Sequence, residues 1–202
     1  MSKLEIKPLK KSDYRKCIQF AKKGMHFNKY TKNPVGLELY SRYFWYNELI
    51  SATKIYAAYQ NEQLAGVLLL NEFGKQKPAA TFFKRVFVEI MEKLVRNFDR
   101  ANPYDDVNKV MLTDYRKHYK PTAEINYLAA DPDNQTKGIG TFLLDQVAQD
   151  YDGCEINLYT DTDCSYQFYD YRGFERYREA TIRYRRGEKF VPLTCFLYRR
   201  KF

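Results

Sequence analysis

The sequence is poor in the residues that build disulfide scaffolds and zinc sites. It has four cysteines, none of them in a C-x-x-C pair, and two histidines, His26 and His118. Scattered thiols of this kind are typical of reduced, mostly buried side chains, so neither a disulfide framework nor a structural zinc site is expected. We therefore expect an apolar core to hold the fold, and no bound metal.

Long apolar runs are also absent. No segment approaches the roughly 18 consecutive apolar residues of a membrane-spanning helix. The opening segment, MSKLEIKPLKKSDYRK, lacks the apolar centre of a signal peptide. These absences predict a cytoplasmic protein that does not bind membranes.

Apolar and aromatic residues, in contrast, are plentiful. They make up 45% and 17% of the 202 residues, enough for one domain with a substantial core. The net charge of +9 favours phosphate-rich partners, either nucleic acid or a phosphorylated cofactor. Much of that charge lies after residue 170, where alternating basic residues on strands usually form a solvated face.

One stretch, residues 122–151, combines a strand, a glycine-bearing turn and an amphipathic helix. Residues 122–130 alternate as a strand does, and DPDN at 131–134 is a cluster of turn-forming residues. The segment QTKGIG at 135–140 then leads into a helix whose apolar residues recur with helical spacing.

This turn has the features of a phosphate-binding loop. A helix start presents backbone N–H groups at the positive end of the helix dipole, where they can bind a phosphate. Gly138 and Gly140 have no side chain to keep an anion away from that backbone. Neither the Walker A pattern nor the three-glycine dinucleotide fingerprint is present.

The pattern that is present, Gln135-x-x-Gly138-x-Gly140, resembles the coenzyme A pyrophosphate loop of the GNAT superfamily of N-acetyltransferases. The strand before it ends in LAADP, which is similar to the Leu-Ala-Val-x-Pro that often precedes this loop in the family. A second block, residues 154–177, resembles the family segment Asn-x-x-Ala-x-x-Phe-Tyr followed by Gly-Phe. In that block Phe168, Tyr169, Gly173 and Phe174 match, whereas Thr162 replaces the Asn and Ser165 replaces the Ala.

The resemblance implies an α/β fold with a mixed, mostly antiparallel sheet of about seven strands flanked by helices. In such a fold the fourth and fifth strands are parallel and splayed. Sequence patterning agrees with this order. It predicts strands at residues 4–9, 53–59, 63–72, 122–130, 154–160, 175–185 and 190–199, and helices at 13–23, 37–51, 81–98, 104–119, after the glycine turn, and at 163–171.

Residues 74–121 exceed what the minimal family fold needs. The two helices predicted there would form a helical hairpin inserted between the third and fourth strands. We expect the whole chain, 1–202, to be a single acyltransferase domain that contains this insertion. The insertion is either a lid or wall for the acceptor, or a packing or dimer-forming element.

The resemblance also implies which residues bind acetyl-coenzyme A. The pantetheine arm is expected between the splayed strands, with the N–H of Ala130 donating to the oxyanion that forms on the thioester carbonyl. The expected cofactor-binding residues are Leu128, Ala129, Ala130, Gln135, Thr136, Lys137, Gly138, Ile139, Gly140, Thr141, Thr162, Ser165 and Phe168.

Two residues are candidates for proton transfer. Tyr169 is the general acid that the resemblance implies, because a phenol is protonated at neutral pH and can donate to the departing thiolate. Glu124 is the candidate general base that removes the amine's proton through water, and burial would raise its pKa towards that role. Cys164 suggests a rival acetyl-enzyme route, but that route needs a nearby base and both histidines are far off in sequence, so direct attack is favoured.

The sequence therefore predicts an N-acetyltransferase that moves an acetyl group from acetyl-coenzyme A to a primary amine. A small-molecule acceptor is favoured over a protein, and a polycationic amine only if carboxylates such as Glu38, Glu48 or Glu124 line its site. The alternative is a non-catalytic basic module that uses the same fold for nucleic acid or a protein partner. A longer acyl donor and a homodimer are left open.

Overall fold

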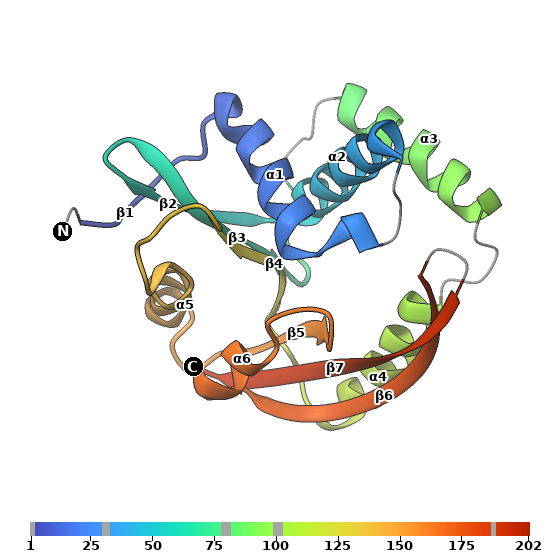
Figure 1. Ribbon diagram of the computed structural model, residues 1–202. Coiled ribbons are helices and arrows are strands. Elements are labelled where there is room, and N and C mark those ends of the chain that lie inside the picture. Colours follow the sequence, from blue (N-terminus) through green and yellow to red (C-terminus); the bar gives the residue numbers. More distant parts are fainter. Residues whose placement is uncertain (1–2, 30–32, 78–81, 99–102, 187–188) are drawn as a thin grey trace.

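The computed structural model describes residues 3–29, 33–77, 82–98, 103–186 and 189–202. Its centre is a seven-stranded sheet in the order β1-β2-β3-β4-β5-β7-β6 (Figure 1). All neighbouring strands are antiparallel except β4 and β5, which are parallel, so the predicted mixed sheet is confirmed. The strands are β1 (Glu5–Lys7), β2 (Lys54–Gln60), β3 (Gln63–Glu72), β4 (Ala123–Ala130), β5 (Glu155–Asp161), β6 (Glu175–Arg186) and β7 (Lys189–Lys201).

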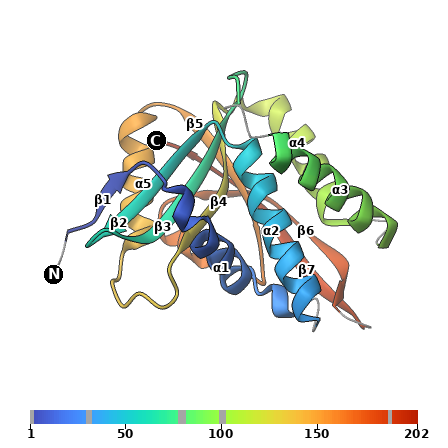
Figure 2. The same ribbon diagram turned by 90° about the horizontal axis from the view of Figure 1, so that it is seen from above.

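Helices cover both faces of the sheet. α1 (Tyr14–Gly24) and α2 (Pro34–Ser51) lie on one face, and α5 (Ile139–Asp150) lies on the other (Figure 1, Figure 2). The remaining helices are α3 (Phe82–Phe98), α4 (Pro103–His118) and the short α6 (Gln167–Tyr171).

β3 is buried from both faces, which explains its continuous apolar run LAGVLLL. Leu68 and Leu70 pack in the core beneath α5. Val67 and Leu69 point the other way, into a core with α1, α2 and the fully buried Trp45. Because side chains alternate along a strand, β3 contributes to a separate core on each face.

β4 carries a β-bulge at Asn126. The β3 partners of Ile125 and Tyr127 are the adjacent residues Leu70 and Leu69, so Asn126 is the extra residue. A bulge rotates the side chains that follow it. Tyr127 consequently faces the α1–α2 core, whereas Ile125 faces the α5 core.

β4 and β5 separate soon after they meet. Their parallel pairing covers only residues 123–125 and 156–158, although both strands continue well beyond it. The β5-facing edge of residues 126–130 is therefore open, as predicted for the splayed pair. Backbone groups along such an edge need hydrogen-bond partners from solvent or a ligand.

The segment between β3 and β4 contains the two predicted helices, and each of them packs on a different part of the fold. α3 packs on α2, with the Phe87 ring 5.8 Å from the Tyr46 ring. α4 packs on β6 and β7, where Met111 and Tyr115 lie buried beside Leu197. The apolar face of each helix is therefore covered by the body of the fold.

Two helix starts differ from the prediction for local reasons. α6 begins at Gln167 rather than at residue 163, because the Asp161 side chain accepts the N–H of Asp163 at 2.8 Å and forms a turn instead. α2 begins earlier than predicted, at Pro34, because the Asn33 side chain accepts two N–H groups of the first turn.

Candidate active site

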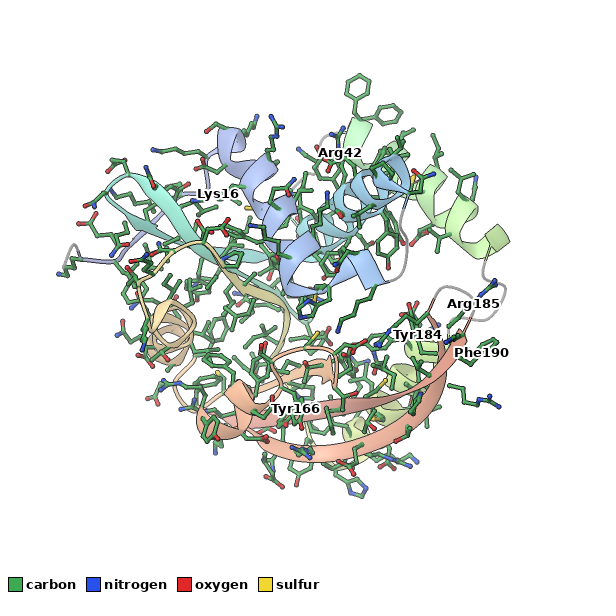
Figure 3. The ribbon with its side chains drawn as sticks, viewed as in Figure 1. Lys16, Arg42, Tyr166, Tyr184, Arg185 and Phe190 are labelled. Carbon is green, nitrogen blue, oxygen red and sulfur yellow. The ribbon has the colours of Figure 1, made fainter. Side chains whose placement is uncertain are left out.

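The loop between β4 and α5 is held in place by its own polar side chains. Asp131 and Asn134 each accept the backbone N–H of the residue two positions further on, at 3.0 and 2.9 Å. The Thr136 hydroxyl donates to the Gln60 side chain at 2.9 Å, and Lys16 forms an ion pair with Asp131 at 2.7 Å. Figure 3 labels Lys16 on the α1 side of this loop. The loop is thus anchored to β2 and α1 before α5 begins.

The start of α5 presents free backbone donors. Gly138 precedes the first turn with a φ of 85°, a conformation that favours glycine, and its carbonyl accepts the N–H of Phe142 at 2.8 Å. The N–H groups of Ile139, Gly140 and Thr141 lie in the first turn and have no helical carbonyl to bind. This arrangement suits a phosphate group.

The side chains of the predicted phosphate loop divide into two groups. Gln135 and Lys137 are exposed and available to a ligand. The Thr136 hydroxyl is engaged by Gln60, and Ile139, the first residue of α5, is buried between this helix and the sheet. Only the backbone of these last two loop residues is therefore open to an anion.

α5 touches α6 through Gly140 and Phe168. A Cβ atom on Gly140 would lie 3.0 Å from Cζ of Phe168, closer than an unstrained contact allows. The missing side chain at Gly140 therefore makes room for the aromatic ring, a packing requirement in addition to the predicted access for an anion.

Tyr169 follows Phe168 and packs on the α5 core. Its ring lies 5.4 Å from Phe168, 5.6 Å from Phe174 and 6.0 Å from Tyr198. Burial is the larger cause that raises the pKa of the phenol, and the nearby Cys164 raises it further. Among the described residues, the phenol hydroxyl has no hydrogen-bond partner. It is a protonated group whose proton is not shared with another side chain.

Glu124 lies on the opposite face of the sheet. It pairs with Asn157 in the β4–β5 ladder, and Asn157 Nδ2 donates to Glu124 Oε2 at 3.2 Å. Ile156 and Leu158 on either side of Asn157 face the α5 core, so Asn157 and Glu124 face α2 and α4. The predicted acid and base are therefore not neighbours, but lie on the two sides of the splay.

The environment of Glu124 acts on its charge in two directions. Burial raises the pKa of this carboxyl, whereas the Asn157 hydrogen bond and the positive charges of Arg116 and Lys77 lower it. The net pKa is above the ordinary value, which is the direction predicted for a buried carboxylate.

Glu48 on α2 is a second half-buried carboxylate that sequence reasoning did not assign to proton transfer. Burial and then the charge of Glu124 raise its pKa to about 7, while the Asn126 and Asn47 side chains act in the opposite direction as hydrogen-bond donors. A signal was present in the sequence. Glu48 stands one helical turn after the buried Trp45, on a stripe where a carboxylate is unexpected.

Tyrosines surround the two carboxylates. Burial raises the pKa of Tyr40 on α2 and of Tyr159 on β5, and the charges of Glu48 and Glu124 respectively act in the same direction. Tyr40 also interacts with Tyr184 on β6, which Figure 3 labels near the free end of the β6–β7 pair. The carboxylates thus lie among side chains from α2, β4, β5 and β6.

The other predicted cofactor residues lie on the open strand edge or on the α6 side. Leu128 packs towards the α5 core, Ala129 towards the α1–α2 core, and Ala130 is exposed at the end of β4. Thr162 bonds to the β7 backbone through both its N–H and its hydroxyl, at 3.0 and 3.3 Å. Its hydroxyl is therefore committed to the sheet, and Ser165 is exposed in the turn before α6.

Cys164, the rival nucleophile, is poorly suited to attack. Its Sγ lies 3.6 Å from Met25 Sδ, and burial raises the pKa of the thiol to about 12. Because the thiolate is the reactive form, this thiol is unreactive near neutral pH.

Within the described ranges, no three or more His, Cys, Asp and Glu side chains converge as metal ligands would. The helices in those ranges also lack the combination of length and apolar character that crossing a bilayer requires.

Several solved structures share this fold. PaiA N-acetyltransferase from Thermoplasma acidophilum, in complex with coenzyme A, is 17% identical, with a TM-score of 0.53 and 99% of each chain covered. Arabidopsis thaliana Naa50, in complex with the bisubstrate analogue CoA-Ac-MVNAL, is 15% identical, with a TM-score of 0.50 over 98% of this chain and 99% of that one. An N-acetyltransferase from Staphylococcus aureus Mu50 is 12% identical, with a TM-score of 0.52 and 99% of each chain covered.

At these identities the likeness concerns the fold alone. No curated protein matches the sequence. A family model described as "Acetyltransferase (GNAT) family" matches residues 24–174, which is most of the chain. The chain therefore belongs to the GNAT acetyltransferase family.

Proposed function

We propose that this protein is an N-acetyltransferase that moves an acetyl group from acetyl-coenzyme A to the primary amine of a small molecule. The observation that carries the proposal is the contact between Gly140 and Phe168. Through it, the helix start with free N–H donors is packed against the helix that bears Tyr169. A phosphate site and a protonated phenol thus lie on the same side of the splayed strands.

The donor is proposed to occupy that side. Its pyrophosphate accepts hydrogen bonds from the first-turn N–H groups of α5, with the exposed Gln135 and Lys137 beside it. The pantetheine arm lies along the open edge of residues 126–130, beside Leu128 and Ala129. The N–H of Ala130 is the proposed donor to the oxyanion of the thioester carbonyl.

The acceptor is proposed to approach from the other face. The amine lone pair attacks the thioester carbon, the C–S bond breaks, and the thiolate takes the Tyr169 proton. The amine proton passes to a carboxylate on the α2–α4 face, either Glu124, as predicted, or Glu48. Half-buried carboxyl groups with raised pKa values suit this step because they hold a proton more readily near neutral pH.

We propose that the whole chain acts as one acyltransferase domain and that α4 forms a wall of the acceptor site. Two features support this role. The negative charge of Asp105, in the first turn of α4, raises the pKa of both Glu48 and Tyr40 on α2. Burial and then the charge of Asp161 on β5 raise the pKa of Tyr104 in the same turn. The start of α4 therefore lies near both α2 and the splayed strand β5.

A non-catalytic nucleic-acid module is less consistent with the surface charges. Arg178 pairs with Asp114 at 2.9 Å, Arg176 with Asp170 at 3.0 Å, and Arg199 with Glu155 at 2.6 Å. These arginines belong to the basic C-terminal segment, and their charge is offset within the protein. Phosphate-directed binding depends on basic side chains that are available to phosphates.

Thermal unfolding with and without saturating acetyl-coenzyme A tests the proposal. We expect binding to raise the melting temperature and an acceptor screen to release free thiol. The proposal is wrong if acetyl-coenzyme A, coenzyme A and a desulfo analogue all leave the melting temperature unchanged. Tighter, salt-sensitive binding to nucleic acid would instead support the binding module.

A further inference from the structure

Three buried amide oxygens near the proposed acceptor side have no hydrogen-bond partner. They are the Oδ1 atoms of Asn126 on β4, Asn157 on β5 and Asn108 on α4. Asn157 is completely buried, and its amide nitrogen already donates to Glu124. Buried polar atoms without a partner are uncommon in folded proteins, so these three oxygens indicate a missing donor.

Two of these oxygens lie beside carboxylates, and carboxylates accept hydrogen bonds. Asn157 lies against Glu124, and Asn126 acts on Glu48 as a hydrogen-bond donor, which leaves its oxygen free. Asp105 adds a third negative charge, which raises the pKa of Glu48. A ligand complementary to this set must bring N–H donors and positive charge, and an ammonium group supplies both.

Two such groups can be held because the carboxylates stand at different positions along the splay. Glu124 and Asn157 lie in the part where β4 and β5 are still paired. Asn126, the neighbour of Glu48, lies in the open part, where the thioester is proposed to be. Glu48 is therefore the carboxylate nearer the reacting carbon, and Glu124 is farther along the same face.

From this arrangement we infer that the acceptor is a diamine or polyamine. Glu48 takes the proton of the attacking nitrogen, and Glu124 with the Asn157 oxygen binds a second ammonium group. The positive charges of Arg116 and Lys77 lower the pKa of Glu124. The negative charge of this carboxylate therefore interacts with these two side chains as well as with the proposed ligand. The inference rests on the proposed acetyltransferase function and adds the chemical class of its acceptor.

The proton and electron balance of the step is complete. The attacking ammonium first gives one proton to Glu48 and becomes a neutral amine with a free electron pair. That pair forms the C–N bond as the C–S bond breaks, and Tyr169 protonates the thiolate and then regains a proton from solvent. Glu48 releases its first proton to solvent and then takes the second amine proton. The distant ammonium keeps its charge throughout.

A series of acceptors tests the inference, of which 1,4-diaminobutane, butylamine and 4-aminobutyrate share a four-carbon chain. Thiol release is measured with 1,4-diaminobutane, spermidine, butylamine and 4-aminobutyrate under identical conditions. We expect kcat/KM for the diamine or triamine to exceed that for butylamine by about tenfold or more, because a charged hydrogen-bonded group is gained. 4-Aminobutyrate should be the poorest acceptor, since its carboxylate would meet Glu124.

A substitution at Glu124 tests its proposed role in binding the second ammonium group. Glu124→Gln should reduce the diamine-to-butylamine ratio of kcat/KM by about tenfold, because the charge that binds the second ammonium is lost. Glu38→Gln is the matched control, since Glu38 lies on α2 but interacts with Lys22 and Arg42 at 3.8 Å. That control should leave the ratio unchanged.

A direct binding measurement keeps this inference distinct from the proposed function. Calorimetry should detect 1,4-diaminobutane binding to the coenzyme A complex of the wild type, and weaker binding to Glu124→Gln. Equal turnover of butylamine and the diamine, or no turnover of any diamine while acetyl-coenzyme A binds, overturns the diamine inference and leaves the donor site intact. Failure of acetyl-coenzyme A to bind overturns the proposed function itself.

Discussion

A Cβ atom added to Gly140 would meet the ring of Phe168 at 3.0 Å, so the start of α5 and the helix that bears Tyr169 are packed as one unit. The two residues belong to sequence blocks almost 30 positions apart, one at the phosphate loop and one after β5. Their contact connects the proposed position of the cofactor's phosphates to the position of the phenol. Disturbing it should therefore affect cofactor binding before it affects the overall fold.

Gly140→Ala tests this connection. The new methyl group displaces Phe168 or the first turn of α5, and we expect acetyl-coenzyme A to bind about tenfold more weakly, a loss of about 1.4 kcal/mol. Calorimetry on the purified variant measures this change. Gly24→Ala is the control, because a Cβ there meets nothing within 4 Å. Unchanged affinity in Gly140→Ala would mean that the contact has no role in binding.

Tyr169→Phe tests the proposed general acid. Without the hydroxyl, the thiolate must leave unprotonated or take a proton from water, and we expect kcat to fall by about 10²-fold. The melting-temperature shift caused by acetyl-coenzyme A should persist, because the phenyl ring still packs with Phe168 and Phe174. Tyr171→Phe on the same helix is the control, since Tyr171 is exposed. Full activity of Tyr169→Phe would remove this residue from the mechanism.

The strands and helices were predictable from local periodicity, and the family from two short motifs. The strand at 63–72 and the start of α5 match the prediction because their apolar patterns and turn residues are unambiguous. The start of α6 was wrong, because the Asp161 side chain competes with the helix for the N–H of Asp163.

The acceptor side was much less predictable, because its residues come from elements far apart in the chain. Glu48 and Glu124 are separated by two strands and two helices, and only the fold brings their charges within interaction range. The bulge at Asn126 is invisible in the sequence as well. Motifs identify the proposed donor loop because it is local in sequence, whereas the proposed acceptor site depends on how α2, α4 and β4 pack.

Gly66→Ala tests the packing of α5 on the sheet. A Cβ atom on Gly66 would lie 2.6 Å from Ile139 Cγ2 and 3.0 Å from the Ala129 carbonyl oxygen. We expect a loss of about 1–3 kcal/mol in the free energy of unfolding, measured by urea titration. The double variant Gly66→Ala/Ile139→Ala should lose less stability than the sum of the losses of the two single variants, because removing Ile139 Cγ2 relieves the clash. Additive losses would show that Ile139 does not limit the approach.

Glu48→Gln should stabilise the protein at alkaline pH. The folded-state pKa of about 7 lies above the ordinary 4.5, so ionisation of Glu48 opposes folding. This penalty is absent below about pH 4.5, grows as the pH rises towards 7, and is then constant. We expect the variant to gain on the order of 1–3 kcal/mol at pH 8 and nothing at pH 4, measured by urea unfolding at both pH values. Glu38→Gln should show no such difference between the two pH values.

The same residue should set the acidic limb of the activity profile. If Glu48 accepts the amine proton, kcat/KM rises with pH up to about 7 as Glu48 ionises, with Glu124 and Asp105 as the charged groups that raise this pKa. Glu48→Gln should lower kcat/KM by about 10²-fold and abolish this limb. A variant that is both more stable and less active identifies a charge kept for function, because stability alone would favour its removal. If Glu48→Gln retains the acidic limb and full activity, the base is Glu124, and the same profile measured on Glu124→Gln should then lose that limb.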